Sequence, residues 1–478
     1  MPISRKPNHR GLWLIYPLML VLFWTPLPFG SKPEWAVVLL CWLVIVLAIV
    51  GLANIMFGQW QPAFSLYRAW PFHVAFLVIL GWVWLQSIPL PVVWVEWLSP
   101  ESYQHYFRAY TATGELLPDS IPLSLDAYAT RISGWLTLAY YLLFCLVLAL
   151  VSSETQLKRL AWTLVAAGTF QAAFGAFSTL SGVESLLFAD KETYLNVATG
   201  TFVNRNSFAG FLEMTLAVGI GLLLAQMRDQ PAKNWKDRIG NILKTLLSNK
   251  VILRSALAAM VIGLVLSRSR MGNSAFFSSL IIAGILYIIC RRKLSRGILF
   301  LFASLIIVDM AILSQWFGID QVINRIEQTS MEKESRPNVA KLTLDIIADY
   351  PTTGTGAGTY YTALPAYHDG SWRRFYDLAH NDFLQFAAEF GLPAYCVLAL
   401  MVLMALWHGL QAMRLRRNPL MIGMGFSSLM GITAILIHST VDFNLQIPAN
   451  GAYFVVLMAV AVIARYLPTT RVKPYKKD

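Results

Sequence analysis

Long runs of apolar residues, separated by short polar stretches, recur from one end of the chain to the other. Runs of roughly 17–25 apolar residues are long enough to cross a bilayer as helices. They are continuous instead of alternating, which excludes a membrane β-barrel. The pattern predicts an all-α polytopic membrane protein. The twelve predicted spans are 11–28, 34–56, 72–90, 133–151, 161–182, 206–226, 252–268, 271–290, 297–316, 383–407, 420–438 and 450–465.

Composition agrees with this interpretation. Of the 478 residues, 56% are hydrophobic and only 13% are charged, and a soluble chain could not cover its core with so little charge. The first apolar run resembles the start of a signal peptide, but no clear cleavage site follows it in PLPFGSKPEW. We therefore expect an uncleaved first span. The four cysteines all fall inside apolar runs, so the sequence predicts no disulfide framework.

The basic residues lie mainly in alternate connections. Those connections and the two ends of the chain hold 25 of the 38 Lys and Arg, whereas the loop 317–382 has six Lys and Arg against nine Asp and Glu. By the positive-inside rule, both termini are cytoplasmic and that acidic loop is on the outer side. The net charge of +12 therefore reflects membrane topology and gives no reason to expect nucleic acid as a partner.

Two outer loops are long, 90–132 and 317–382, within a single membrane domain covering 1–478. Loops of this length are often functional. In the second, Pro337 suits the first position of a helix that Pro351 ends. We expect its apolar face to lie on the membrane surface or on the bundle; the face consists of Val339, Leu342, Ile346 and Ile347. The run GTGAG at 354–358 lacks the Lys-Ser/Thr of a P-loop and is interpreted as a flexible turn.

The stretch AHNDFLQFAAEFG enters the tenth predicted span from the large outer loop. Asp382 with Gln385 three residues later predicts a capping pair, which places His380 and Asn381 just before a helix N-terminus. The positive end of the helix dipole attracts anions and favours a neutral ring that can accept a proton. Glu389 lies two turns further in. The alternative is that Asn381 and Asp382 only cap a helix and His380 is an ordinary loop residue.

Other polar residues gather at the same outer ends of spans. Arg205 precedes the sixth span with Glu213 two turns deeper, and Arg268 and Arg270 separate the seventh span from the eighth. Asp442 follows the eleventh span, in a segment with His438, Asn444 and Asn450. Charged side chains at bilayer depth normally face an interior or a cavity, because exposing them to lipid is unfavourable. The alternative for the arginines is snorkelling toward lipid headgroups.

Such a set of residues suffices for transfer of a glycan from a lipid-linked diphosphate donor. Two arginines can bind the diphosphate and stabilise the charge that grows as the glycosidic bond breaks. A neutral histidine can take the proton from the attacking hydroxyl. No cluster with metal-ligand spacing occurs on the outer side, so we expect catalysis without metal or cofactor.

Several stretches carry a resemblance to a known family: SIPLSLDAYATR at 120–131, FVNRNSFAGFLE at 202–213, SRSRMGNSAF at 267–276, DYPTTGTGAGTYY…AHNDFLQFAAEFGLP at 349–393 and HSTVDFNLQIPANGAYF at 438–454. They look like the O-antigen ligase and polymerase superfamily of bacterial envelope glycosyltransferases. The resemblance implies an inner-membrane protein that moves a glycan from undecaprenyl diphosphate to an acceptor on the periplasmic side. It implies His380 as catalytic base and maps a Ser-Arg motif best to Ser269 and Arg270. Because Met271 follows where Gly or Ala is common, Arg268 stays an alternative. Arg205 matches less securely.

The leading hypothesis is a ligase with lipid A-core as acceptor. The near alternative is a polymerase of O-antigen or exopolysaccharide repeats, which would use the same cavity. A secondary transporter of twelve spans would show inverted repeats and ionisable residues near the midplane. No repeat is evident in this sequence, and its polar residues lie at the outer ends of spans. A purely structural membrane protein would need neither the outer arginines nor His380.

Overall fold

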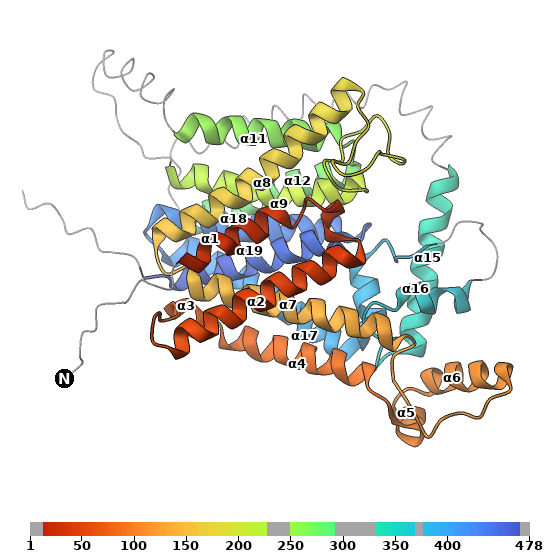
Figure 1. Ribbon diagram of the computed structural model, residues 1–478. Coiled ribbons are helices and arrows are strands. Elements are labelled where there is room, and N and C mark those ends of the chain that lie inside the picture. The colour runs from red at the N-terminus through yellow and green to blue at the C-terminus, as the bar shows by residue number, and fades with distance from the viewer. Residues whose placement is uncertain (1–12, 227–248, 292–329, 369–375, 469–478) are drawn as a thin grey trace, which may run out of the picture.

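The computed structural model describes residues 13–226, 249–291, 330–368 and 376–468. Its main part is a bundle of long helices that run side by side (Figure 1). In this described part, nine helices are long and apolar enough to cross a membrane: α2 (Glu34–Met56), α4 (Trp70–Ser87), α7 (Ala127–Leu150), α8 (Glu154–Ser181), α9 (Arg205–Gln226), α12 (Arg270–Arg291), α17 (Asp382–Leu415), α18 (Pro419–His438) and α19 (Pro448–Tyr466). Two further apolar helices are α1 (Ile15–Trp24) and α11 (Asn249–Leu266). The chain is thus an all-α polytopic membrane protein.

Eleven of the twelve predicted spans fall on these helices, and the span 297–316 lies outside the described residues. Most differences between the predicted and the observed helix ends have a local cause. The helix α8 begins seven residues before the predicted 161, because Ser153 Oγ accepts a hydrogen bond from the amide of Gln156 and caps it. The helix α7 begins earlier for the same reason, with Asp126 as its N-cap. The helix α1 is shorter than predicted and ends just before Pro26.

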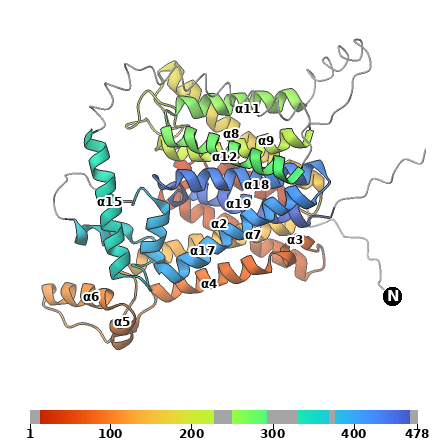
Figure 2. The ribbon, with the colours of Figure 1, turned by 180° about the vertical axis from the view of Figure 1, so that it is seen from behind.

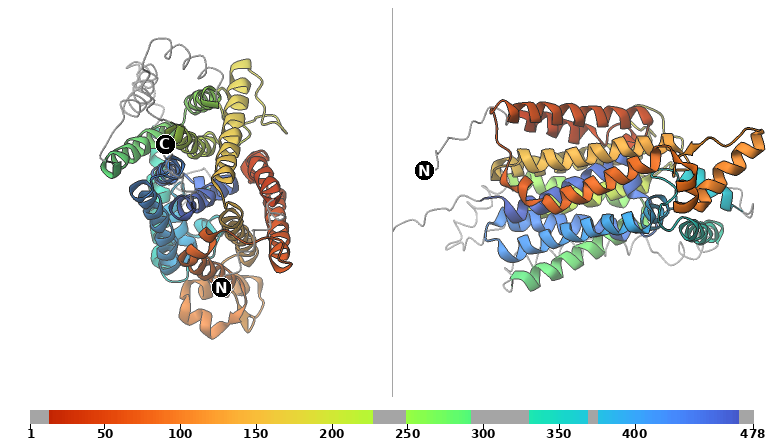
Figure 3. Two further views of the ribbon diagram at one scale, coloured as in Figure 1. Left: turned by 90° about the vertical axis from the view of Figure 1, so that its left-hand side faces the viewer. Right: turned by 90° about the horizontal axis from the view of Figure 1, so that it is seen from below.

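The helices α9, α18 and α19 form the centre of the bundle, surrounded by the others (Figures 2 and 3). Nearly all residues of α9 and α19 are buried, although both are long and apolar enough to cross a membrane. Small residues permit this packing. A Cβ atom on Gly221 of α9 would meet the backbone oxygen of Gly423 of α18 at 2.2 Å, so the two helices touch backbone to backbone.

The shorter elements gather at one end of the bundle, which we call the loop end (Figure 1). They include β1 (Leu90–Pro91), α5 (Val92–Leu98), α6 (Pro100–Thr113), β2 (Ser120–Ile121), α15 (Ser330–Asp349), α16 (Tyr360–Ala363) and the 3-10 helices η3 (Leu364–Tyr367) and η4 (Asn444–Gln446). Two other short elements are η2 (Phe29–Ser31) and α3 (Phe64–Arg68). The strands β1 and β2 pair antiparallel, with Leu90 opposite Ile121.

The helix α15 confirms one prediction and corrects another. Its predicted apolar face is buried or partly buried and packs on the bundle, in a cluster that joins α15 and α16 to the start of α17. Pro337 was predicted as the first helical residue, but the helix begins at Ser330 and Pro337 lies inside it. Proline has no amide hydrogen to donate, so it is favoured in the first turn of a helix, but a proline does not force a helix to begin at its own position.

The predicted tenth span is not a single uninterrupted helix. Within α17, Gly391 has φ 75° and ψ 157°, which are not helical values, and Pro393 follows. The residues before Gly391 form a short first part with its N-terminus at the loop end, and the residues after it form the long second part. Discontinuous helices of this kind can occur at membrane depth where the broken backbone is buried in protein.

Candidate active site

His380 lies directly before the first part of α17, as predicted. The predicted capping pair is wrong, however: the N-cap is Asn381, whose Oδ1 accepts a hydrogen bond of 3.1 Å from the amide of Leu384. Gln385 instead accepts from the amide of Ala379 and donates to Glu389. His380 itself has φ 51°, in the left-handed region. Backbone strain of this kind is typical of functional sites, where surrounding contacts hold it.

The turn between α18 and α19, residues 439–447, is bound to the start of α17. Asp382 Oδ2 accepts hydrogen bonds from Ser439 Oγ at 2.6 Å and from the amide of Leu445 at 3.0 Å. The amide of Asp382 donates to the carbonyl oxygen of Ser439. The ring centroid of Phe443 lies 4.8 Å from that of His380, edge to face. The α18–α19 turn therefore fixes both the helix start and the imidazole.

The same turn reaches the first turn of α9. Asn206 Nδ2 donates a hydrogen bond to Asp442 Oδ2, which brings the segment of Arg205 to that of His380. The Arg205 guanidinium lies 5.6 Å from the ring centroid of Tyr194, a cation–π contact. Its Nε is buried and makes no hydrogen bond to any described residue. A buried charged donor in this state is suited to an anionic ligand.

The helix α12 begins next to α9. Ser269 Oγ accepts a hydrogen bond from the amide of Gly272 and caps the helix. A Cβ atom on Gly272 would lie 2.6 Å from Cβ of Ala209, so the first turns of α12 and α9 are in close contact. Arg270 is the first residue of α12, and Arg268 lies in the preceding turn with φ 52°. Both side chains are exposed.

Glu213 does not face the open end of the site. Its Oε1 lies 2.7 Å from Nδ1 of His438, at the end of α18, and both side chains are fully buried. Glu213 Oε2 and His438 Nε2 make no hydrogen bond with the rest of the described chain. This pair joins the two most closely packed helices directly below the α18–α19 turn, so its contact supports the turn that holds His380.

Glu389 organises the GTGAG segment. Its carboxylate accepts hydrogen bonds from the amides of Gly358 and Tyr360 at 2.9 and 3.3 Å, and from Gln385 Nε2 at 3.0 Å. The prediction of a flexible turn is wrong, since most of residues 353–358 are buried and are hydrogen-bonded to the end of the first part of α17. Burial and the nearby Glu389 charge raise the pKa of Tyr360 to about 12, although a hydrogen bond with Thr343 opposes them. Tyr360 therefore stays a neutral phenol.

Gly354 packs directly against the backbone of the first part of α17, and replacing it with alanine should destabilise the protein. It has φ 64°, and a Cβ atom there would lie 2.3 Å from the backbone oxygen of Glu389. We expect the free energy of unfolding to fall by about 2–5 kcal/mol, which is the sum of the cost of a left-handed alanine and the cost of overpacking. The matched control is Gly114→Ala, with φ 74° and no atom within 4 Å, for which only about 1–2 kcal/mol is expected. Thermal unfolding in detergent compares them; equal shifts would contradict this interpretation.

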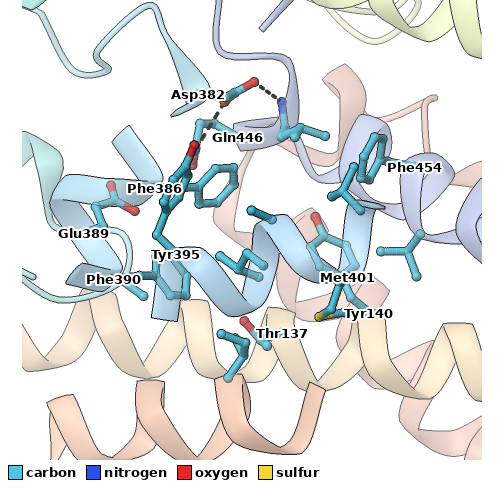
Figure 4. A pocket seen from close by; sticks show the side chains of 18 of the residues that line it. Thr137, Tyr140, Asp382, Phe386, Glu389, Phe390, Tyr395, Met401, Gln446 and Phe454 are labelled. Carbon is cyan, nitrogen blue, oxygen red and sulfur yellow. Dashed lines mark hydrogen bonds between the residues drawn. The ribbon is translucent and has the colours of Figure 1, made fainter. Parts of the chain in front are cut away.

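A cavity of about 380 Å³ lies beside the start of α17, among α4, α7, α17 and α19. Figure 4 shows Asp382 and Gln446 at its polar end, and Tyr140 and Met401 farther along it. Most of its lining is aliphatic or aromatic, including Phe386, Phe390 and Phe454. An apolar cavity with a few polar groups at one end suits an amphipathic ligand whose polar part lies at the loop end.

Sequence reasoning named His438 but missed its pairing with Glu213, and it missed the contacts of Asn206 and Phe443. Asn206 directly follows Arg205, and Phe443 directly follows Asp442. Both therefore lie inside segments already singled out, but no spacing rule links Asn206 to Asp442, 236 residues away, or Phe443 to His380 in another segment. Of the predicted set, the structure joins the segments of His380, Arg205 and Asp442 by direct contacts and the start of α12 by packing on α9. It assigns Glu213 and Glu389 to supporting contacts.

The chain matches a known family over part of its length. Residues 255–399 match the family model described as O-antigen ligase, whereas no curated protein matches the chain. The matched segment includes Arg268, Arg270, the GTGAG run and His380. It thus contains the turn before α12, the Glu389 contacts and the broken first part of α17. This match over part of the chain, together with the membrane fold, supports the O-antigen ligase and polymerase superfamily and indicates a membrane enzyme of the ligase or polymerase type.

Proposed function

We propose that the protein transfers a glycan from undecaprenyl diphosphate to a hydroxyl of lipid A-core, as an O-antigen ligase. The observation that carries the proposal is the α18–α19 turn. Through Phe443 it contacts His380, and through Asp442 it contacts the first turn of α9 beside Arg205. A proton acceptor and a cation that can bind diphosphate are thereby held by one rigid segment. Positioning of this kind can lower a barrier by several kcal/mol, roughly 7–11 in favourable cases.

In the proposed reaction, His380 accepts the proton of the acceptor hydroxyl as its oxygen forms a bond to the anomeric carbon. The bond from that carbon to the diphosphate oxygen breaks, and the electron pair leaves with undecaprenyl diphosphate. Arg205 and Arg270 bind the phosphate oxygens and stabilise the charge that develops there. The products are the glycosylated acceptor, undecaprenyl diphosphate and the proton on His380, which water removes. No metal ion and no cofactor take part in this scheme.

The cavity provides a location for part of the polyprenyl chain. Its lining is almost entirely apolar, so isoprene units would be removed from water there. Its polar end at Asp382 and Gln446 is next to the segment of His380. A lipid bound in this direction would present its diphosphate toward the arginines at the loop end.

The proposed orientation has both termini in the cytoplasm and the loop end on the periplasmic side of the bacterial inner membrane. The alternation of basic connections supports it. A periplasmic site also suits a donor that carries its own activation, because the leaving diphosphate supplies the free energy and no ATP is needed.

The experiment that tests the function uses the purified protein in nanodiscs with an undecaprenyl-diphosphate-linked glycan. Lipid A-core or a second lipid-linked repeat is supplied as acceptor. We expect glycan on lipid A-core, seen as a mass increase by one donor glycan. Joining of two repeats without transfer to lipid A-core would replace the ligase proposal with the polymerase alternative. Absence of both products with correctly folded protein would refute a glycan transferase of either kind.

Replacing Arg268 and replacing Arg270 should lower the rate of glycan transfer by different amounts. We expect Arg270→Ala to lower kcat by about 10²–10³-fold, the effect of removing one donor from a developing negative charge. Arg268→Ala should change it by no more than about twofold, as an ordinary surface substitution does. The two changes remove the same group two residues apart, so each serves as the other's control. The reverse order of effects would assign the diphosphate contact to Arg268.

A further inference from the structure

The short helix α5 exposes large apolar side chains at the loop end. Val93, Trp94 and Trp97 are 71%, 61% and 81% exposed. At 100° per residue, these three positions fall within one arc of about 100°. Val95, on the other side of the helix, is fully buried. We call Val93, Trp94 and Trp97 the α5 apolar face.

The direction of this face is fixed by its surroundings. Val95 packs in a small core with Ile121 and Leu123, beside the paired strands β1 and β2. The helix α6 is bound to the same segment, since Ser102 Oγ and Tyr106 OH donate to the carbonyl oxygens of Leu123 and Ser124. In Figures 1 and 2, α6 extends beyond α5 and away from the bundle. The α5 apolar face lies opposite that core, where neither the strands nor α6 cover it.

The α5 apolar face continues a surface that already faces lipid. The preceding helix α4 is a candidate membrane span, with an exposed side that consists of Trp70, Val74, Leu77, Val78 and Leu85. The connection from α4 to α5 begins with exposed Ile88. Near the loop end of α4, Trp84 packs edge to face on Trp135 of α7, with centroids 5.5 Å apart. Tryptophans are enriched at the level of the lipid headgroups, so this pair marks that level.

We propose that the α5 apolar face inserts into the lipid headgroup boundary on the loop-end side of the same membrane that α4 crosses. Exposed tryptophans on a short helix next to a span are suited to this boundary, where the ring is removed from water and the indole N–H stays hydrogen-bonded. Glu96 is the charged residue beside the face, and it would be repelled by anionic lipid. The partner is therefore a neutral or zwitterionic lipid surface, held by apolar burial. This inference requires only the membrane fold and not the proposed reaction.

The insertion would anchor the site as well. The amide of Leu125 donates to the carbonyl oxygen of Thr355, and the amide of Ser124 donates to that of Gln86. Gln86 Nε2 in turn donates to the backbone oxygen of Glu389. The segment that carries α5 is thus hydrogen-bonded to the GTGAG run and to the first part of α17, so lipid contact at α5 would fix their depth.

The test measures depth with nitroxide labels on single cysteines in nanodiscs, after the four native cysteines are replaced. The labelled variants are Trp97→Cys on the α5 apolar face, Leu77→Cys on the lipid-facing side of α4 and Arg108→Cys on exposed α6. Collision with oxygen, which partitions into lipid, is compared with collision with a water-soluble nickel complex. We expect the label at 97 about 5–10 Å inside the boundary, between deep Leu77 and aqueous Arg108. Added anionic lipid should not increase its depth.

A label at 97 with the aqueous profile of the label at 108 would overturn the proposal. Strong dipolar coupling between labels at 97 in nanodiscs with two copies would also overturn it, because a second copy would then cover the face. A second variant controls for local misfolding caused by the Trp97→Cys replacement. Val93→Cys keeps both tryptophans, and its label should report the same shallow depth.

Discussion

Replacing His380 with alanine is expected to reduce glycan transfer by about 10²–10⁴-fold, the usual contribution of a positioned general base. The imidazole lies at the N-terminus of α17, between the rings of Tyr376 and Phe443 at 5.6 and 4.8 Å. The two residues that follow it have other contacts: Asn381 caps the helix, and the buried carboxylate of Asp382 accepts three hydrogen bonds. Single-turnover measurement with saturating donor and acceptor isolates the chemical step.

The matched control is His105→Ala, which removes the same side chain from α6 at the loop end. We expect its rate to stay within about twofold of the unchanged protein, as for surface changes in general. The variant His380→Gln should be as slow as His380→Ala, because an amide keeps much of the volume but cannot accept the proton. If His380→Ala is inserted, melts at the normal temperature and transfers glycan at the normal rate, His380 is not the base.

The helices could be predicted because each apolar run is long enough to leave only one way to satisfy its backbone in lipid. The span 34–56 corresponds to α2 without any shift. Errors arose where a polar cap or a proline decides the end, as with Ser153 before α8 and Pro337 inside α15. The break at Gly391 was also missed. Gly391, with φ 75°, packs against Gly354 of the GTGAG run, 37 residues earlier in the chain, and local sequence does not contain that contact.

The grouping of the candidate site residues at one end of the bundle could be predicted, because topology alone brings alternate helix ends to one side of a membrane. This argument gathered His380, Arg205, Arg270 and Asp442 at one end of the bundle. It could not decide which side chains touch. Glu213 and His438 are separated by 225 residues, and their contact results from the close packing of α9 on α18. Glu389 was predicted only as a supporting residue, and its hydrogen bonds to the amides of Gly358 and Tyr360 could not be predicted, because they result from folding of the loop onto the helix.

Breaking the buried pair of Glu213 and His438 should have the largest effect on stability. In Glu213→Leu, the imidazole keeps its place but loses its partner at a fully buried position. We expect the free energy of unfolding to fall by about 3–5 kcal/mol, because an uncompensated polar or charged group in the interior is strongly unfavourable. Since the pair supports the α18–α19 turn, transfer activity should fall together with the melting temperature.

The double replacement, Glu213→Leu with His438→Leu, should recover most of this loss, because two apolar side chains leave no buried group without a partner. Thermal unfolding of the two single variants and the double variant gives the coupling energy between the residues. Ser428→Ala is the control on α18, since its hydroxyl donates to the carbonyl oxygen of Met424 in the same helix. Losses that simply add in the double variant would mean that the two side chains do not stabilise each other, and the support of the turn would then rest on helix packing alone.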